Sequence, residues 1–321
     1  MKATESPAAE HEGIVPEDAA GNRLDQTLAR MFPQYSRARL QNWIKEGSVR
    51  IDGETRRPRD PVFGGERVQV SAQADEVLSL KAQPIDLDVL WADEHALVVN
   101  KPPGLVVHPG AGNADGTLVN GLLHFDERLA ALPRGGLVHR LDKDTGGLLI
   151  VARTLDAYKT LSGAMAARTI KREYAALCVG ALTGGGTIDE PIGRHPVDRK
   201  KMAVSDRGRA ARTHYAIEKR YRGYTLVAVT LETGRTHQIR VHFAHQRWPL
   251  VGDQTYGRRA VPRGASDALN DALANFDRQA LHARRLTFAH PASGETISVA
   301  SELPEDFAQL LRALDDDQSI D

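Results

Sequence analysis

The stretch GGLVHRLDKDTGGLLIV, residues 135–151, consists of two apolar runs separated by a polar turn. The first run leads into Asp142, and the second begins at Leu148. Short apolar runs bounded by turn residues are typical of buried strands. We therefore predict two buried strands joined by a loop that carries Asp142 and Asp144. Loops held by rigid strands are frequent positions for catalytic groups.

The composition is that of a globular protein. The 321 residues are enough for two or three domains, and 41% of them are hydrophobic. A single cysteine, Cys178, excludes an intrachain disulfide framework and a thiolate metal site. No apolar run approaches the roughly 18 residues of a spanning helix, and the acidic N-terminus is unlike a signal peptide. We expect a cytoplasmic protein that does not enter a membrane.

The formal net charge is zero, but the charges are segregated along the chain. The first twenty residues carry one Lys and five acids, and the last twenty carry one Arg and seven acids. The intervening body therefore holds 40 basic and 30 acidic residues. A basic body favours a polyanionic partner. A solvated surface with acidic tails that aid solubility fits the charges alone equally well.

Residues 22–72 have the pattern of a small independent unit. Helical spacing of apolar residues predicts a first helix with Asn22 as its N-cap and a second helix capped by Ser36. Alternating residues then predict two strands, one before the turn at residues 52–53 and one at residues 66–70.

Basic side chains gather near the second predicted helix, where Arg37, Arg39 and Lys45 are candidates for contacts with a phosphate backbone. A solvated charged face is the alternative. The sequence RLDQTLARMFPQYSRARLQNWIKEGSVRIDG, residues 23–53, resembles the S4 RNA-binding domain. This resemblance implies an αL-type RNA-binding fold and RNA rather than DNA as the partner.

Short strands outnumber helices in the remainder of the chain. This pattern predicts an α+β domain with a mixed, mainly antiparallel sheet and peripheral helices. Strands are predicted at residues 89–91, 96–99, 105–107, 171–179, 213–219, 224–232 and 295–300, and helices at residues 117–125, 154–167 and around residues 307–314.

The histidines do not have the spacing of a metal site. His237, His242 and His245 are five and three residues apart, so the i, i+4 pattern of zincins is absent. Alternation at residues 237–242 predicts a strand with Arg240 and His242 on one face. Because an arginine beside a ligand disfavours a dication, hydrogen-bonding roles are favoured over a metal site.

Asp142 has no nearby partner carboxylate except Asp144. A glycosidase needs two carboxylates on opposite sides of the scissile bond, which two positions of one loop do not readily supply. A lone aspartate can act as a covalent nucleophile if an arginine keeps it ionised, and Arg140 and Arg240 are the candidates. Spacing alone favours the simpler interpretation that both carboxylates cap a turn.

Seven segments resemble, in order, the signatures of the RluA family of RNA pseudouridine synthases. They cover about residues 85–305 and are NKPPGLVVHPG (100–110), GLVHRLDKDTGGLLIVART (136–154), KREYAALCVG (171–180), RHPVDRKKMAV (194–204), LETGRTHQIRVHFAH (231–245), PLVGDQTYG (249–257) and ALHA (280–283). The resemblance implies an isomerase that flips a uridine out of an RNA, breaks its glycosidic bond and rejoins the uracil through C5. No metal or other cofactor is implied.

The same resemblance assigns roles to individual residues. Asp142 matches the catalytic aspartate, and Arg240 matches the basic residue that pairs with it. Tyr174 matches the tyrosine that stacks on the flipped base and is a candidate for the later proton transfer. Arg140 matches the arginine that helps to flip the uridine. Most members have Ser at the position of Gly146, and we expect the glycine to loosen that turn without changing the function.

Two further residues of the fifth segment, Arg235 and His237, are expected to bind substrate with Arg140. Together with the S4-like unit, the resemblance implies 23S ribosomal RNA as substrate, in the helix 69 stem-loop, either free or in large-subunit precursor particles. The chemical route stays open between attack on the ribose, attack on the base and elimination. The rivals are a non-catalytic ribosome-binding or assembly protein and a metal-dependent hydrolase.

We expect a monomer whose chain is divided into five parts. These are a disordered tail (1–13), an S4-like RNA-binding domain (14–76), a linker (77–86), a pseudouridine synthase catalytic domain (87–314) and an acidic tail (315–321).

Overall fold

A computed structural model describes residues 9–32, 35, 37–72, 81–110, 112–257, 261–262 and 264–318. The chain divides into two compact units, Met1–Ser79 and Leu80–Asp321, and the boundary falls inside the linker expected at residues 77–86. The first unit has a hydrophobic core of its own, which contains Leu28 and Trp43.

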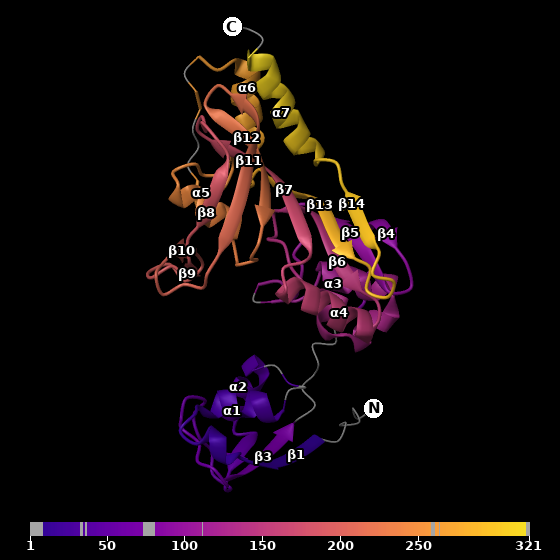
Figure 1. The fold of residues 1–321 in the computed structure, drawn as a ribbon, viewed down its shortest axis with the longest axis vertical. Helices are drawn as coiled ribbons and strands as arrows, with labels where there is room; N and C mark the ends of the chain where they lie inside the picture. Colours follow the sequence, from indigo (N-terminus) through magenta and orange to yellow (C-terminus); the bar gives the residue numbers. More distant parts are fainter. Residues whose placement is uncertain are drawn as a thin grey trace, which may run out of the picture. The chain divides into compact units, whose positions relative to one another are not determined.

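The first unit packs two helices against a three-stranded antiparallel sheet with the order β1-β3-β2 (Figure 1). The predicted helices and strands of this unit are present. Its elements are β1 (Ala9–Ile14), η1 (Glu17–Ala19), α1 (Leu24–Met31), α2 (Arg37–Glu46), β2 (Val49–Ile51) and β3 (Arg67–Ala72).

Two details of the first unit differ from the predictions. The N-cap of α1 is Arg23, which makes no side-chain capping bond, and not Asn22. Residues 9–13 are not a disordered tail, because they pair with β3 from Ala9 opposite Ala72 onward. No hydrophobic periodicity marks this strand, because it is formed by pairing with residues 67–72, far away in the sequence. Ser36 and residues 1–8 lie outside the described residues.

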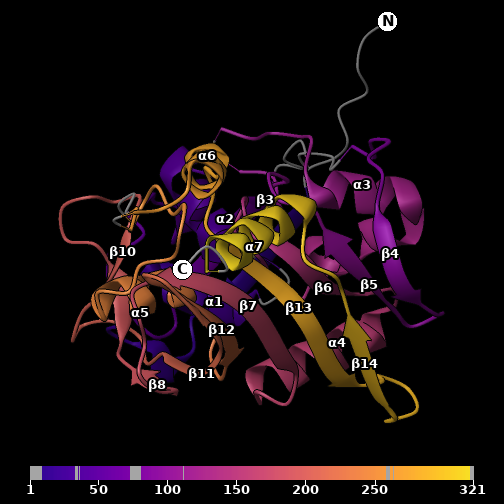
Figure 2. The same cartoon turned by 90° about the horizontal axis from the view of Figure 1, so that it is seen from above.

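The second unit is built on a nine-stranded sheet, which Figure 2 follows from β4 to β8. The order is β4-β5-β6-β13-β7-β12-β11-β8, with β14 paired to β13. Only β6 and β13 are parallel among the described pairs, so the expected mixed, mainly antiparallel sheet is confirmed. The strands are β4 (Asp88–Ala92), β5 (Ala96–Lys101), β6 (Gly146–Ala152), β7 (Lys171–Val179), β8 (Gly186–Asp189), β11 (Arg212–Tyr221), β12 (Tyr224–Leu231), β13 (Leu281–Ala289) and β14 (Thr296–Ala300).

Helices cover both faces of this sheet. Alternate residues of one strand point to opposite faces, and Leu149 packs in the core cluster of α3 (Leu118–Phe125) and α5 (Gln238–His245). Its neighbour Ile150 packs in the cluster of α4 (Leu155–Ala166) instead. Figure 1 shows α6 (Asp267–Asn275) and α7 (Glu305–Gln318) together at the end of this unit away from α3 and α4. There they pack with Leu177 of β7. A separate hairpin is formed by β9 (Ile192–Arg194) and β10 (Met202–Val204).

The run before Asp142 is not a strand, although the run after it is β6. Residues 133–136 form the 3₁₀ turn η3 (Pro133–Gly136), in which Arg134, Gly135 and Gly136 all have positive φ. A Cβ on Gly136 would lie 2.1 Å from the carbonyl oxygen of Ala152, so this close approach needs glycine. Gly146 is also not in the turn, since it begins β6 opposite His282.

Residues 105–107 are not a strand either. Prolines 102 and 103 end β5 at Lys101, because proline cannot donate to a sheet ladder. The carbonyls of Val106 and Val107 accept hydrogen bonds from the first turn of α3 instead.

The predicted strand at residues 237–242 is the helix α5. Its residues from Gln238 to Phe243 are all buried, so the alternation of apolar and polar residues did not mark an exposed face. The acidic tail expected from residue 315 is also helical as far as Gln318. Asp317 is buried there and accepts hydrogen bonds from Arg222 and the backbone of Ser266.

Candidate active site

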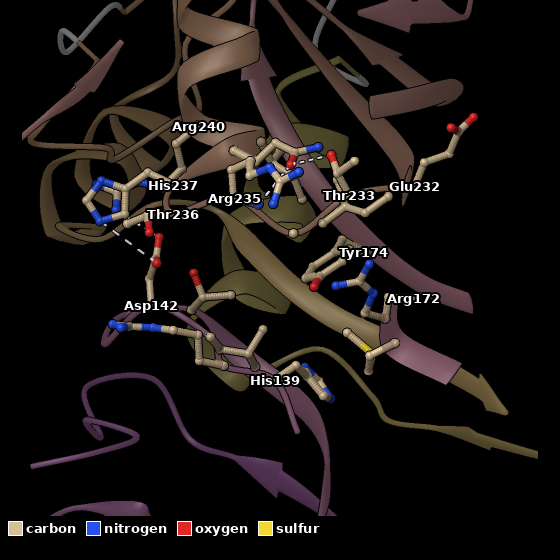
Figure 3. A pocket seen from close by; sticks show the side chains of 18 of the residues that line it. His139, Asp142, Arg172, Tyr174, Glu232, Thr233, Arg235, Thr236, His237 and Arg240 are labelled. Carbon is tan, nitrogen blue, oxygen red and sulfur yellow. Dashed lines mark hydrogen bonds and ion pairs between the residues drawn. The ribbon is translucent and has the colours of Figure 1, made fainter. Parts of the chain in front are cut away.

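A cavity of about 560 Å³ brings together most of the residues that the sequence singled out. Figure 3 shows it between the loop after η3, strand β7 and the segment before α5. The predicted site residues that line it are Arg140, Asp142, Tyr174, Arg235, His237 and Arg240.

The loop that carries Asp142 is held from beneath by a buried lysine. Lys101 is 1% exposed, and its Nζ donates to the carbonyls of Pro102 (2.8 Å), Leu105 (2.9 Å) and Lys143 (2.8 Å). Burial lowers the pKa of Lys101 to about 7, against the opposing charges of Asp144 and Asp142. Because Lys143 directly follows Asp142, this bond fixes the backbone beside Asp142.

Asp144 does not shape the turn through its side chain. Among the described residues its carboxylate makes no hydrogen bond, and the loop is closed by Thr145 N donating to the Asp142 carbonyl at 3.2 Å. Gln279 Nε2 supports the end of the loop by donating to Thr145 Oγ1 at 3.0 Å. The two aspartates of the motif therefore have different surroundings.

Arg240 connects Asp142 to a second, fully buried carboxylate. Its Nη1 donates to Asp142 Oδ2 at 3.0 Å, and its Nε and Nη2 donate to Asp253 at 2.8 and 2.9 Å. Burial acts to lower the pKa of Arg240, but the fork of bonds to Asp253 and the charge of Asp142 outweigh it and raise the pKa. The guanidinium is therefore a permanent cation held between the carboxylates of Asp142 and Asp253.

His237 faces the other oxygen of the same carboxylate. Its Nε2 lies 3.9 Å from Asp142 Oδ1, and its Nδ1 lies 2.7 Å from the hydroxyl of Tyr256. That hydroxyl accepts a hydrogen bond from Met202 N at 2.8 Å, so its own hydrogen is available for Nδ1. Burial lowers the pKa of His237, which makes the neutral ring the form present at pH 7. These contacts place the proton of the neutral ring on Nε2, toward Asp142.

Tyr174 presents its side chain to the cavity from β7. It is 5% exposed, and its hydroxyl has no hydrogen bond to any residue in the described part of the chain. Burial and the charge of Asp142 raise the pKa of Tyr174, against the opposing charge of Arg172. The phenol is therefore protonated at neutral pH, and its surroundings differ from those of a core tyrosine with a bonded hydroxyl.

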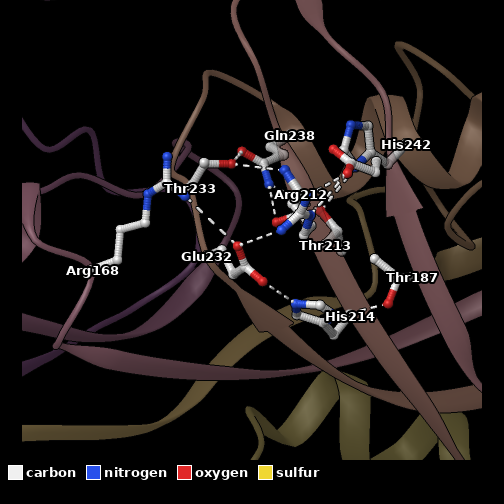
Figure 4. A network of polar contacts seen from close by, with 10 residues as sticks. Arg168, Thr187, Arg212, Thr213, His214, Glu232, Thr233, Gln238 and His242 are labelled. Carbon is white, nitrogen blue, oxygen red and sulfur yellow. Dashed lines mark hydrogen bonds and ion pairs between the residues drawn. The ribbon is translucent and has the colours of Figure 1, made fainter.

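A polar network fixes residues 233–238, which line the cavity and include two of the predicted site residues, Arg235 and His237 (Figure 4). Gln238 Oε1 accepts from Thr233 Oγ1 at 2.8 Å and from Arg235 N at 2.9 Å. Gln238 Nε2 donates to Thr213 Oγ1 at 3.0 Å on the neighbouring strand. A buried amide with its donors and acceptors engaged holds this segment in one conformation.

The S4-unit residues named from sequence do not line the cavity. Arg37 donates to the buried carboxylate of Asp25 at 2.8 and 3.1 Å, so much of its charge serves the unit's own structure. Lys45 is exposed on α2. Nothing is described for the side chain of Arg39.

One histidine of α5, His242, is engaged in hydrogen bonds. His242 Nδ1 lies 2.9 Å from Thr213 Oγ1, and its Nε2 lies 2.9 Å from the carbonyl of Glu190. Within the described ranges, no group of three or more His, Cys, Asp or Glu side chains could hold a metal ion. A metal-dependent hydrolase built on these histidines therefore has no support in the geometry.

Comparison with known proteins identifies the family. Residues 95–245 match the RNA pseudouridylate synthase family, and residues 22–68 match the S4 domain. A ribosomal large subunit pseudouridine synthase D from Xanthomonas campestris pv. campestris is 54% identical over 309 residues, which cover 96% of this chain and 93% of that protein. The chain belongs to the RNA pseudouridylate synthase family.

Other members support the same assignment. Proteins of the same name from Pseudomonas aeruginosa and Salmonella typhimurium are 50% and 49% identical, over 95% and 94% of this chain and 95% and 93% of their own lengths. The solved structure of human RNA pseudouridylate synthase domain containing 4 has a TM-score of 0.55 and 28% identity, and the match covers 71% of this chain and 92% of the human chain. The expected family, fold class and isomerase class are thereby confirmed.

Membership directs attention to residues of this pseudouridine synthase that the sequence did not single out. Asp253 and Tyr256 both lie in the segment PLVGDQTYG, which was recognised as a family signature but given no role. Arg172 and Lys101 likewise lie in recognised segments. Each of the four is a charged or phenolic residue inside a family signature, which is the feature that could have drawn attention to it. Their interaction partners lie far away in the sequence, so the contacts could not be predicted without a structure.

No helix among the residues with described structure has the length and apolar character needed to cross a membrane.

Proposed function

We propose that this enzyme converts specific uridines of large-subunit (23S) ribosomal RNA to pseudouridine, with Asp142 as the catalytic carboxylate. The observation that carries the proposal is the Asp142 carboxylate, 3.0 Å from Arg240 and in the same cavity as Tyr174. The names of the relatives, which are ribosomal large subunit synthases, support this RNA as the substrate.

The reaction is an isomerisation and needs no external reactant. The C1′–N1 bond breaks, the uracil turns, a C1′–C5 bond forms, and the proton on C5 is finally lost while N1 gains one. Asp142 acts by attack on the ribose, attack on the base or assistance to elimination, and each route requires it to be ionised. Arg240 serves that requirement, because a permanent cation offsets the cost of burying a carboxylate.

Tyr174 and Arg140 act on the base before the chemistry begins. Taking a uridine out of its stack costs a few kcal/mol, and stacking on an aromatic ring returns roughly 1–3 kcal/mol. Tyr174 supplies that ring from a rigid strand, and the exposed Arg140 beside the catalytic loop occupies the space that the base leaves. Arg235 and His237 bind the nucleotide from the opposite wall.

We place the target in the helix 69 stem-loop, where loop uridines are already partly unstacked and therefore cheaper to flip. The S4 domain contributes sequence-independent contacts to the RNA backbone, in which the exposed Lys45 takes part. We further propose that the enzyme acts as a cytoplasmic monomer, on free 23S RNA or on large-subunit precursor particles.

The test is to incubate the purified protein with unmodified 23S RNA and map pseudouridines at nucleotide resolution. New pseudouridines in the helix 69 loop are expected, and EDTA should not reduce their yield. Modification elsewhere would refute the target, and the absence of any pseudouridine would favour the rival view of a non-catalytic ribosome-binding protein. Loss of activity in EDTA would instead point to a metal requirement.

A further inference from the structure

Arg172 is a buried guanidinium without a partner among the residues that the structure describes. Its exposed fraction is 6%, it lines the cavity, and no described residue forms a hydrogen bond or ion pair with it. Its Nε is fully buried and unpaired. Burying a charge without a partner costs free energy, so an unpaired buried guanidinium indicates a site for an anionic ligand.

The acids of the cavity are all committed to other cations. Seven arginines line the cavity but only two acids, Asp142 and Glu232. Asp142 pairs with Arg240. Glu232 interacts with two arginines and a histidine, as Figure 4 shows, and Arg172 is not among them. These are His214 at 2.7 Å, Arg212 at 3.3 Å and Arg168 at 3.7 Å.

His139, whose pKa is affected by the charge of Arg172, does not accept a hydrogen bond from it. His139 Nε2 accepts from Ile150 N at 3.2 Å, so the neutral ring carries its proton on Nδ1 and is a donor there. Burial, reinforced by the charges of Arg172 and Arg134, lowers the pKa of His139 to about 3. The surroundings of Arg172 thus consist of donors and positive charge, which suit an anion.

The position of Arg172 relative to Tyr174 relates it to the bound nucleotide. The two residues are two apart on β7 and therefore share a face of the strand. In Figure 3 Asp142 and Arg172 lie on opposite sides of Tyr174. A nucleotide with its ribose at Asp142 and its base on Tyr174 therefore brings a neighbouring part of the RNA to Arg172.

We propose that Arg172 binds one of the two backbone phosphates that flank the flipped uridine. This inference rests on the proposed function. A phosphate supplies the negative charge that the site lacks, whereas a uracil carbonyl is neutral. The guanidinium fork also matches the oxygens of a phosphate. The absence of a side chain at Gly234 leaves room for the guanidinium, because a Cβ there would lie 2.8 Å from Arg172 Nη1.

The experiment measures how tightly the protein binds a stem-loop RNA that has a single uridine in its loop. In two altered RNAs, a neutral methylphosphonate replaces the phosphate on the 5′ side or on the 3′ side of that uridine. For the unaltered protein, one of the two substitutions should weaken binding about 10- to 100-fold, as expected for a lost bond between charged groups. Arg172→Gln should bind the unmodified RNA with a similar loss. It should then be insensitive to that methylphosphonate.

Arg168→Gln is the matched control, because Arg168 also lines the cavity but already pairs with Glu232. It should keep the full sensitivity to the methylphosphonate. Gly234→Ala keeps the charge but displaces the guanidinium, so it should reproduce the behaviour of Arg172→Gln. This variant and the unaltered protein still provide a test if Arg172→Gln does not fold.

The inference is overturned if neither methylphosphonate affects the unaltered protein, or if Arg172→Gln remains as sensitive as the unaltered protein. Sensitivity to loss of a uracil carbonyl in place of the phosphate would assign Arg172 to the base and also overturn it. Because binding is measured without turnover, the phosphate contact can hold while pseudouridine formation fails. Conversely, if the protein forms pseudouridine in 23S RNA but neither methylphosphonate weakens binding, the proposed function stands and only the phosphate contact of Arg172 is refuted.

Discussion

Arg240 binds only one oxygen of Asp142. Its Nη1 donates to Oδ2 at 3.0 Å, while Oδ1 faces His237 across 3.9 Å. A carboxylate held at one oxygen is both oriented and able to react through the other. This asymmetry leads directly to the first prediction.

Asp142→Asn should reduce pseudouridine formation by at least about 10³-fold, because the amide is neither a nucleophile nor a base. Its oxygen can still accept from Arg240, so folding and RNA binding should persist. The measurements are product formation in single turnover and RNA affinity. Asp144→Asn is the control from the same loop and should keep most of the activity. Equal losses in the two variants would contradict the distinct role of Asp142.

Tyr256→Phe isolates the hydroxyl that orients His237. The ring, which lies 5.1 Å from the Arg240 guanidinium, is retained, and only the bonds to His237 and Met202 are lost. We expect kcat to fall about fivefold with little change in KM, since one hydrogen bond contributes about 1 kcal/mol. The activity of the variant should also respond differently to pH near the pKa of His237.

Tyr158→Phe on α4 is the matched control and should leave both kinetic constants unchanged, because Tyr158 does not line the cavity. A change in KM alone for Tyr256→Phe would contradict a positioning role for its hydroxyl and would indicate a direct contact with RNA.

Lys101→Met should destabilise the second unit and misplace the catalytic loop. It removes the ammonium donor from the carbonyls of Pro102, Leu105 and Lys143. The Lys143 carbonyl keeps a bond from Gly104 N at 3.0 Å, so two carbonyls are left without a donor in the described part of the chain. Orphaned buried groups cost about 1–3 kcal/mol each when no water replaces the partner. We expect a lower midpoint in denaturant melts and a lower kcat in the protein that remains folded. A variant with unchanged stability would show that water replaces the ammonium.

Acid should destabilise the fold through buried histidines. His282 is 1% exposed, and burial lowers its pKa from 6.5 to about 4. Its contribution is therefore complete above pH 6.5 and is lost as the pH falls toward 4, where the loss of stability amounts to about 3 kcal/mol. Measured unfolding free energies should fall over this window.

His282→Gln keeps a polar side chain near Ser301 but does not titrate in this window. Its unfolding free energy should fall less steeply between pH 6.5 and 4 than that of the unaltered protein. Parallel curves for the two proteins would show that His282 is not responsible.

Local patterns predicted the helices and strands that bury one regular face. The helix α4 is an example, because it has enough residues to show its period. The pattern failed at α5, where Gln238, Arg240 and His242 are buried with bonded polar groups. It also failed at η3, where positive φ angles are set by the contact between Gly136 and β6.

The site could be predicted only in part. Resemblance gave Asp142, Tyr174 and Arg240 as members of one site, and the structure places all three at one cavity. It did not give Asp253 as the second partner of Arg240, nor Lys101 as the anchor of the loop. Arg37 was proposed as a phosphate contact from its charge alone, but its guanidinium pairs with Asp25. That pairing depends on how α1 and α2 pack, which a count of charges does not reveal.

The pairing of β1 with β3 has a practical consequence for work with the S4 domain alone. A fragment that began at residue 14, where sequence alone placed the start of the domain, would lack most of β1 and leave one edge of β3 bare. An uncovered edge recruits strands from other molecules and promotes aggregation. Expression of this RNA-binding module should therefore start before Ala9.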